Sequence, residues 1–154
     1  MGLHSVSWSV NVSALDQMKL IEDSLKWIAG EKSSIEITKD KSFHGAKQYY
    51  IEAKNNNKKD SQKSLERLGE EVLREILELG VQTRVDDNKF FHIRLELSEL
   101  VRGEVSLANE KTVSSTVKGK FKIESYPGDS TIKVISNLIE ELIDSGKQIQ
   151  LLFD

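Results

Sequence analysis

The chain has 154 residues, of which 38% are hydrophobic and 31% are charged, and its net charge is −3. This length and composition are typical of one globular domain, residues 1–154, and exclude a disordered chain. Because no apolar run approaches the roughly 20 residues that span a bilayer and the N-terminus lacks a secretory pattern, we expect a cytoplasmic protein with no membrane partner. The sequence contains no cysteine, which excludes disulfides, zinc–cysteine sites, iron–sulfur clusters and thiol catalysis.

The first third of the chain predicts a strand, a helix and a hairpin. Apolar residues alternate there with serine and asparagine, which is typical of a strand with one buried face: Val6, Trp8, Val10 and Val12. Ser13 is placed to cap a helix over 14–29, in which apolar residues recur at helical spacing until Gly30. Strands are predicted around 35–37 and 49–53, with a loop between them.

The middle of the chain predicts a long amphipathic helix over 61–79, capped by Asp60 or Ser61. Gly80 follows as its stop. The inward face of this helix carries apolar residues at helical spacing: Leu65, Leu68, Val72, Ile76 and Leu79.

More strands are predicted after this helix. A hairpin is expected over 81–85 and 91–97, because the Asp-Asp-Asn segment between them is a turn sequence. Further strands are expected over 103–108 and 117–123.

The last helix is predicted over 130–145, capped by Asp129 or Ser130 and ended by Gly146. Residues 149–153 are expected to form an edge strand or a packed tail. The predicted order is β-α-β-β-α-β-β-β-β-α. We therefore expect the α+β class, with a largely antiparallel sheet and three helices packed on one side.

The distribution of charge is uneven. Residues 39–63 contain seven Lys against three acidic residues, and residues 100–122 contain five basic against two acidic residues. Two basic segments in an acidic chain can form one positive face, of the kind that phosphate binding requires. Scattered, solvated lysines are the open alternative.

The sequence shows no constellation that would support catalysis. His4, His44 and His92 are widely separated and none has a helical partner four residues away, so no metal site is predicted. No Gly-x-Ser-x-Gly elbow, Walker loop or Gly-x-Gly-x-x-Gly turn is present, and the acidic pair at 86–87 is better explained as turn chemistry. We therefore predict that the protein is not an enzyme and has no catalytic residues, cofactor or metal.

Lys118, Lys120 and Lys122, the lysine stripe, alternate along one predicted strand. Alternation places their ammonium groups on one face, about 7 Å apart, close to the phosphate spacing along a nucleic-acid strand. The same alternation in the preceding strand exposes His92 and Arg94. The open alternative is the solvent side of an antiparallel sheet, where lysine also discourages edge pairing.

A second candidate group lies in the predicted loop between the two hairpin strands. It combines positive charge with an aromatic ring and an imidazole, which suits stacking on unpaired bases and contact with phosphates. The open alternative is a solvated hairpin tip. The group consists of Lys39, Lys41, Phe43, His44 and Lys47.

The order of several short segments resembles a known family. They are Leu3-His4-Ser5-Val6-Ser7 before the first helix, Phe43-His44-Gly45, Tyr49-Tyr50-Ile51-Glu52-Ala53, Lys89-Phe90-Phe91-His92-Ile93-Arg94-Leu95 after an Asp-Asp-Asn turn, and Tyr126-Pro127 before the closing helix. Over nearly the whole chain, this layout resembles the archaeal RNA-binding, exosome-subunit-like family. Those are small proteins similar in fold to the ribosomal protein that binds 5S rRNA.

The resemblance implies a non-catalytic RNA-binding role as an accessory to RNA processing or degradation, with RNA and RNA-processing proteins as partners. Members of the family follow the arginine-bearing strand with an Asp-Lys pair. The corresponding stretch here reads Leu95-Glu96-Leu97-Ser98, so no contact by such a lysine is carried over.

Two functions therefore compete. The first is an RNA-binding module that uses the lysine stripe, His92, Arg94 and the loop group. The second is a protein–protein interaction or scaffold protein, such as a homodimer joined at sheet edges, without direct RNA contact. A positive patch that spans both basic segments favours the first, and a flat apolar surface favours the second.

Overall fold

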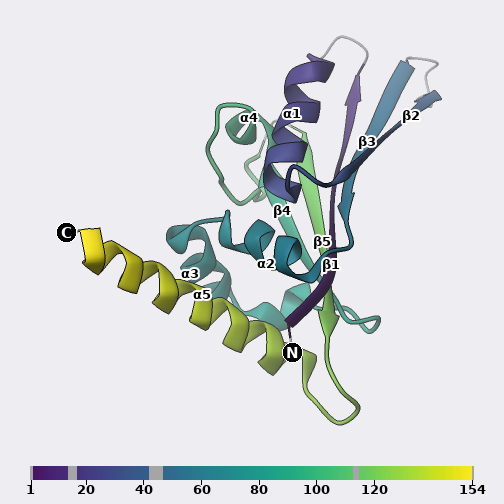
Figure 1. The fold of residues 1–154 in the computed structure, drawn as a ribbon. Coiled ribbons are helices and arrows are strands. Elements are labelled where there is room, and N and C mark those ends of the chain that lie inside the picture. Colours follow the sequence, from purple (N-terminus) through teal and green to yellow (C-terminus); the bar gives the residue numbers. More distant parts are fainter. Residues whose placement is uncertain (1, 14–16, 42–46, 113–114, 154) are drawn as a thin grey trace.

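The computed structural model describes residues 2–13, 17–41, 47–112 and 115–153. Its strands pair antiparallel in the order β2-β3-β1-β5-β4: β1 (Gly2–Ser13), β2 (Ser34–Lys41), β3 (Lys47–Asn55), β4 (Phe90–Glu96) and β5 (Thr116–Glu124). The helices are α1 (Met18–Ala29), α2 (Lys58–Glu66), α3 (Glu70–Leu79), α4 (Leu97–Leu100) and α5 (Thr131–Phe153), with a 3-10 helix, η1 (Val81–Arg84). Figure 1 shows the helices on one side of the sheet, so the predicted α+β class is confirmed, with more helices than the three expected.

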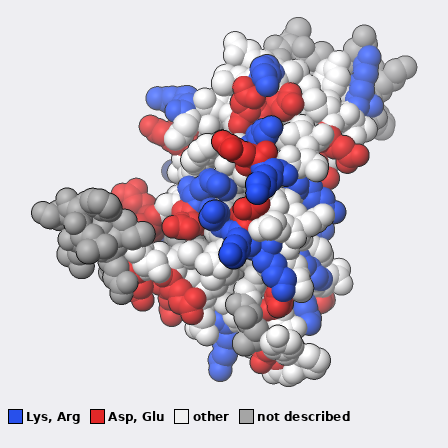
Figure 2. Space-filling model, viewed as in Figure 1, with Lys and Arg blue, Asp and Glu red and all other residues white. Residues whose placement is uncertain are grey.

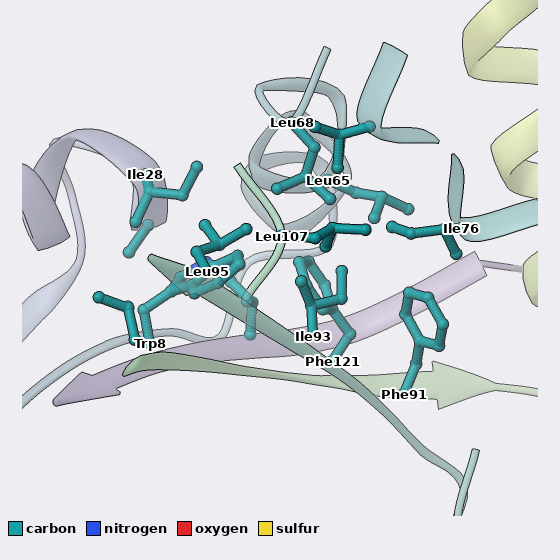
Figure 3. Close-up of a cluster of buried hydrophobic side chains, with 14 of the residues drawn as sticks. Trp8, Ile28, Leu65, Leu68, Ile76, Phe91, Ile93, Leu95, Leu107 and Phe121 are labelled. Atoms are coloured by element: carbon teal, nitrogen blue, oxygen red, sulfur yellow. The ribbon is translucent and has the colours of Figure 1, made fainter. Parts of the chain in front are cut away.

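The sheet buries one of its two faces, because apolar and polar residues alternate along its strands. The buried side chains include Val6, Trp8 and Val10 of β1, Ile51 and Ala53 of β3, Phe91 and Ile93 of β4, and Phe121 and Ile123 of β5. They pack against apolar residues of the helices, among them Ile28, Leu65, Leu68 and Ile76 (Figure 3). In Figure 1 no described helix covers the opposite face, which carries polar side chains.

Trp8, on the central strand, is fully buried and lies across from Gly119 of β5. A Cβ atom on Gly119 would lie 2.4 Å from Cζ3 of the indole, so only glycine leaves room for the ring. The indole meets the ring of Phe121 edge-on at a centroid distance of 5.7 Å, and its Nε1 donates to Ser64 Oγ at 2.8 Å. Trp8 therefore joins β1, β5 and α2.

The observed N-termini of the helices can be compared with the capping residues predicted from the sequence. α2 follows Asn57, whose side chain accepts a hydrogen bond from the Asp60 backbone N–H at 2.9 Å, so the predicted cap at Asp60 or Ser61 is wrong. Ser13 belongs to β1, Gln17 makes no side-chain cap to α1, and the predicted start of this helix at 14–16 lies outside the described residues. Ser130 caps α5 as predicted, because its Oγ accepts from the Lys133 N–H at 3.3 Å.

Two predicted helix lengths are wrong. The long central helix divides at Gly69, whose φ of 87° separates α2 from α3. Leu68, just before the break, is buried as predicted, whereas Leu79 at the end of α3 is 61% exposed. α5 continues through Gly146 to Phe153, so the predicted stop is wrong and the last residues extend the helix.

Two predicted strands are replaced by other backbone structure. Residues 81–85 form η1 and a single bridge to β4, instead of one arm of a hairpin. Residues 103–108 follow the outer edge of β4 with one bridge, Leu95 to Leu107, and two backbone hydrogen bonds of 2.9 and 2.8 Å. The sheet therefore has five strands rather than the seven predicted, and a loop covers part of its β4 edge.

We expect Gly119→Ala to destabilise the fold by about 1–3 kcal/mol, because the new methyl group must displace the Trp8 ring. Urea denaturation followed by circular dichroism measures the loss. Gly146→Ala is the matched control, since its Cβ would meet nothing within 4 Å and alanine favours a helix. An unchanged midpoint for Gly119→Ala would contradict the packing described here.

Candidate nucleic-acid interface

The open face of the sheet has a floor of small side chains. On β1 this face carries Ser5, Ser7, Ser9 and Asn11. The strand register places Ser7 between Lys54 of β3 and Lys120 of β5. Longer side chains therefore stand on both sides of a shallow channel over β1, which we call the serine trough (Ser5, Ser7 and Ser9).

A hollow of about 250 Å³ lies over the serine trough. Its lining includes Ser5, Ser7, Glu52, Lys54, Phe90 and Lys120. Neighbouring strands are about 4.8 Å apart, so β3 and β5 are separated by about 10 Å across β1. The trough thus has room for one extended polymer strand, with hydroxyl groups below it and with Lys54, Lys120 and the carboxylate of Glu52 at its rim.

The lysine stripe runs along β5 beside the trough and faces β4. The register pairs Lys118 with Arg94, Lys120 with His92, and Lys122 with Phe90. Within the described ranges, no carboxylate forms an ion pair with any of the three lysines. The structure therefore brings the stripe, His92 and Arg94 together on one face.

Phe90 holds two lysines of the stripe in place. The Nζ atoms of Lys120 and Lys122 lie 4.0 and 4.5 Å from the centroid of its ring. Cation–π attraction at such exposed positions is worth about 0.5–1 kcal/mol. Lys122 Nζ also donates to the Asn88 carbonyl oxygen at 2.6 Å. These contacts offset the mutual repulsion of the two ammonium groups and hold Lys120 and Lys122 beside Phe90 without a ligand.

Asp86 fixes the turn before β4 and orients His92. Its Oδ1 accepts from the backbone N–H groups of Asn88 at 2.9 Å and Phe90 at 3.0 Å, as the predicted turn chemistry requires. Its Oδ2 lies 2.7 Å from His92 Nε2. The hydrogen bond with His92, followed by the bond from the Phe90 N–H, holds the pKa of Asp86 below its ordinary value.

The loop group does not join the stripe. Phe43 and His44 lie outside the described residues, and of Lys41 and Lys47 only the backbone is described, as a cross-strand pair. Lys39 is exposed on β2, on the helix-facing side of that strand. Because β3 and β1 separate β2 from β5, Lys39 lies apart from the lysine stripe.

Three features of the interface were not predicted. Lys54 is a cation of the first basic segment on the open face, and it lines the hollow together with Lys120. The alternation that exposes His92 and Arg94 also exposes Phe90, so the sequence contained a signal for the ring. The serine trough could not be predicted from the sequence, because small side chains line a channel only if the strands on both sides carry longer ones, and the order of the strands was not known.

An antiparallel sheet with helices on one face and a basic, aromatic-bearing open face is an arrangement that α+β nucleic-acid-binding proteins use. A family model described as RNA binding matches residues 5–123. The chain belongs to this RNA-binding family. A search of curated proteins found no match.

Solved structures of archaeal proteins show a similar fold. A DUF54 protein from Methanothermobacter thermautotrophicus is 17% identical with a TM-score of 0.73, and the match covers 93% of this chain and 99% of that one. A DUF54 protein from Archaeglobus fulgidus is 22% identical with a TM-score of 0.71, covering 91% and 99%. A UPF0201 protein from Methanococcus jannaschii is 13% identical with a TM-score of 0.55, covering 88% and 92%. Among the described helices, none is long and apolar enough to cross a membrane.

The depressed pKa of Asp86 predicts a pH-dependent contribution to stability. The charged carboxylate stabilises the fold above the ordinary aspartate pKa of about 3.9, and the contribution is lost as the pH falls through the lower folded value. Asp86→Asn should therefore lower the urea midpoint at about pH 7 and change it little at about pH 2. Asp87→Asn, in the same turn, is the control. An equal loss at both pH values would show that the charge is unimportant.

Proposed function

We propose that the chain binds single-stranded RNA across β1, β5 and β4. The phosphates contact the lysine stripe, and ribose hydroxyls or base edges contact the serine trough. The observation that carries this proposal is the lysine stripe on the face that no described helix covers. None of its lysines forms an ion pair among the described residues, and Phe90 holds two of them. Membership of an RNA-binding family supports RNA as the ligand.

The charge of the open face suits a phosphate chain. Lysines two residues apart on a strand are about 7 Å from one another, which matches consecutive phosphates on an extended strand. Arg94 lies opposite Lys118 and adds a guanidinium that binds phosphate with fixed geometry. Lys54 supplies a cation on the other side of the trough. Contacts of this kind set affinity and position and carry little sequence information.

An unpaired strand fits this face better than a duplex. The trough spans about 10 Å between its flanking strands, enough for one polymer strand and too little for two. Serine hydroxyls donate and accept hydrogen bonds, as the ribose 2′-hydroxyl does. Because two ammonium groups occupy the face of the Phe90 ring, we assign this ring to ordering the lysines rather than to stacking on a base.

We further propose that the binding is non-catalytic and that the chain serves in the cytoplasm as an accessory to RNA processing or degradation. Proteins of those processes would then be its partners. The support is the resemblance of the sequence to the exosome-subunit-like family and, through it, to the ribosomal protein that binds 5S rRNA. The lysine stripe supplies positive charge and the serine trough supplies hydrogen-bonding groups, and a protein that binds RNA without catalysis requires both.

The triple variant Lys118→Ala, Lys120→Ala and Lys122→Ala should weaken binding of unrelated single-stranded RNAs about equally. Each lost phosphate contact should also flatten the dependence of log affinity on log salt by about 0.7. Fluorescence-anisotropy titrations at several salt concentrations measure both effects. The matched control replaces Lys39, Lys111 and Lys133 with alanine. These lysines are exposed away from β5 and form no ion pair among the described residues, and their replacement removes the same charge. A triple variant that keeps the parent's affinity and salt slope would overturn the proposed interface.

One observation favours the scaffold alternative. β2 is an edge strand, and its Ile37 is 47% exposed, so a second copy could pair along this edge. We expect that Ile37→Lys leaves both RNA affinity and molecular mass unchanged, because RNA binding uses the other half of the sheet. Sedimentation equilibrium measures the mass. A parent dimer that becomes a monomer with Ile37→Lys, without RNA binding by either, would favour the scaffold function.

A further inference from the structure

Trp27 of α1 is 48% exposed, although the other tryptophan of the chain, Trp8, is fully buried. A large aromatic side chain at the surface is a common anchor for a ligand. Trp27 lines an open groove of about 840 Å³ between α1 and α2, on the helical side of the sheet. This volume lies within the range of about 300–1,000 Å³ that is typical of ligand sites.

Cations outnumber carboxylates around the exposed indole. Four cations line the α1–α2 groove: Lys26, Lys32, Lys63 and Arg67. Three acidic residues also line it, Asp23, Glu31 and Asp60, so the lining has a formal charge of +1. Asp23 is paired with Lys19 at 2.9 Å, and Asp60 accepts from the Asn55 amide at 3.3 Å. Among the described residues, none of the four cations forms an ion pair. Figure 2 shows Lys and Arg side chains gathered over α2 and the adjoining end of α1.

The two helices that form the groove are held together, because side chains of α2 and of the end of β3 donate hydrogen bonds to the last turn of α1. Ser64 Oγ donates to the Ile28 carbonyl oxygen at 2.5 Å, and Arg67 Nη1 donates to the same oxygen at 3.4 Å. The Asn55 amide donates to the Ala29 carbonyl oxygen at 3.2 Å. The indole on α1 and the cations on α2 are therefore positioned relative to each other without a ligand.

We propose that the α1–α2 groove is a second RNA site, which takes one unpaired base on the Trp27 indole and the adjoining phosphates on Lys63 and Arg67. The proposal rests on the proposed RNA-binding function and extends it to the opposite side of the sheet. A flat aromatic face beside unpaired cations complements a nucleotide, which combines a flat base with a negative phosphate. An acidic peptide would match the charges and would leave the indole face unused.

The two RNA sites meet at one end of the sheet. Lys54 faces the serine trough, and α2 begins only four residues later, at Lys58, on the helical side. Ser34 pairs with Lys54 in the sheet, and Lys32, two residues before it, lines the groove. A single RNA strand can therefore pass from the trough around this end of the sheet into the groove.

Tryptophan emission tests the groove directly. The probe is a single-stranded oligoadenylate of about twelve nucleotides, a length within the site sizes of single-strand binders. Because Trp8 is buried, a base that stacks on Trp27 should quench only the exposed indole. We expect quenching that follows binding, and an affinity about tenfold lower for Trp27→Ala. Leu20→Ala is the matched control, since Leu20 is 42% exposed on the same helix outside the groove.

The outcomes separate the groove from the sheet face. In one outcome, the triple lysine variant loses affinity, RNA leaves the tryptophan emission of the parent unchanged, and Trp27→Ala keeps the parent's affinity. This result overturns the groove as an RNA site and leaves the proposed function intact. Quenching that persists in the triple lysine variant at the parent's affinity supports the groove and overturns the sheet interface. Failure of the parent to bind the oligonucleotide at low salt overturns both. Quenching by polyglutamate and not by RNA overturns the groove as an RNA site and indicates a protein partner.

Discussion

The buried side chain of Trp8 is the contact on which both candidate surfaces depend. Its ring occupies the space that Gly119 leaves on β5, and Gly119 stands between the first two lysines of the stripe. Its Nε1 donates to Ser64, whose hydroxyl in turn donates to the Ile28 carbonyl oxygen, next in the chain to Trp27. One indole thus fixes the strand that carries the stripe and the two helices that form the groove.

The core and the lysine stripe are two consequences of the same alternation. Phe121 and Ile123 are buried because they point toward the helices, and the lysines between them must then point away. A slip of one residue would bury the ammonium groups, so packing fixes the register of the stripe. On β1, an irregularity in pairing between Leu3 and Ser5 adjusts the alternation, and Leu3 is buried together with the rest of the core.

The sequence predicted the class, most strands and the exposure of the stripe, because these depend on local periodicity. The predictions were wrong where tertiary contacts, rather than local periodicity, determine the backbone structure. The strand expected over 103–108 lies on the edge of β4 with too few hydrogen bonds to be a strand. Gly69 ends a helix and Gly146 does not, although both interrupt a helical pattern; Gly69 has a positive φ, whereas Gly146 continues α5. Trp27 was missed because helical spacing alone does not show whether a neighbouring helix covers a side chain.

A net charge of −3 is compatible with the two proposed RNA sites, because many of the exposed acidic residues lie away from them. Figure 2 shows acidic side chains over α3 and α5, where the exposed ones include Glu70, Glu71, Glu75, Glu78, Glu140 and Glu141. At physiological salt, charges separated by more than about 8 Å are largely screened from one another, so the acidic helices do not cancel the field of the stripe or the groove. They instead repel a phosphate chain from the α3–α5 side. An RNA strand that occupies both proposed sites would therefore pass the end of the sheet near Lys54.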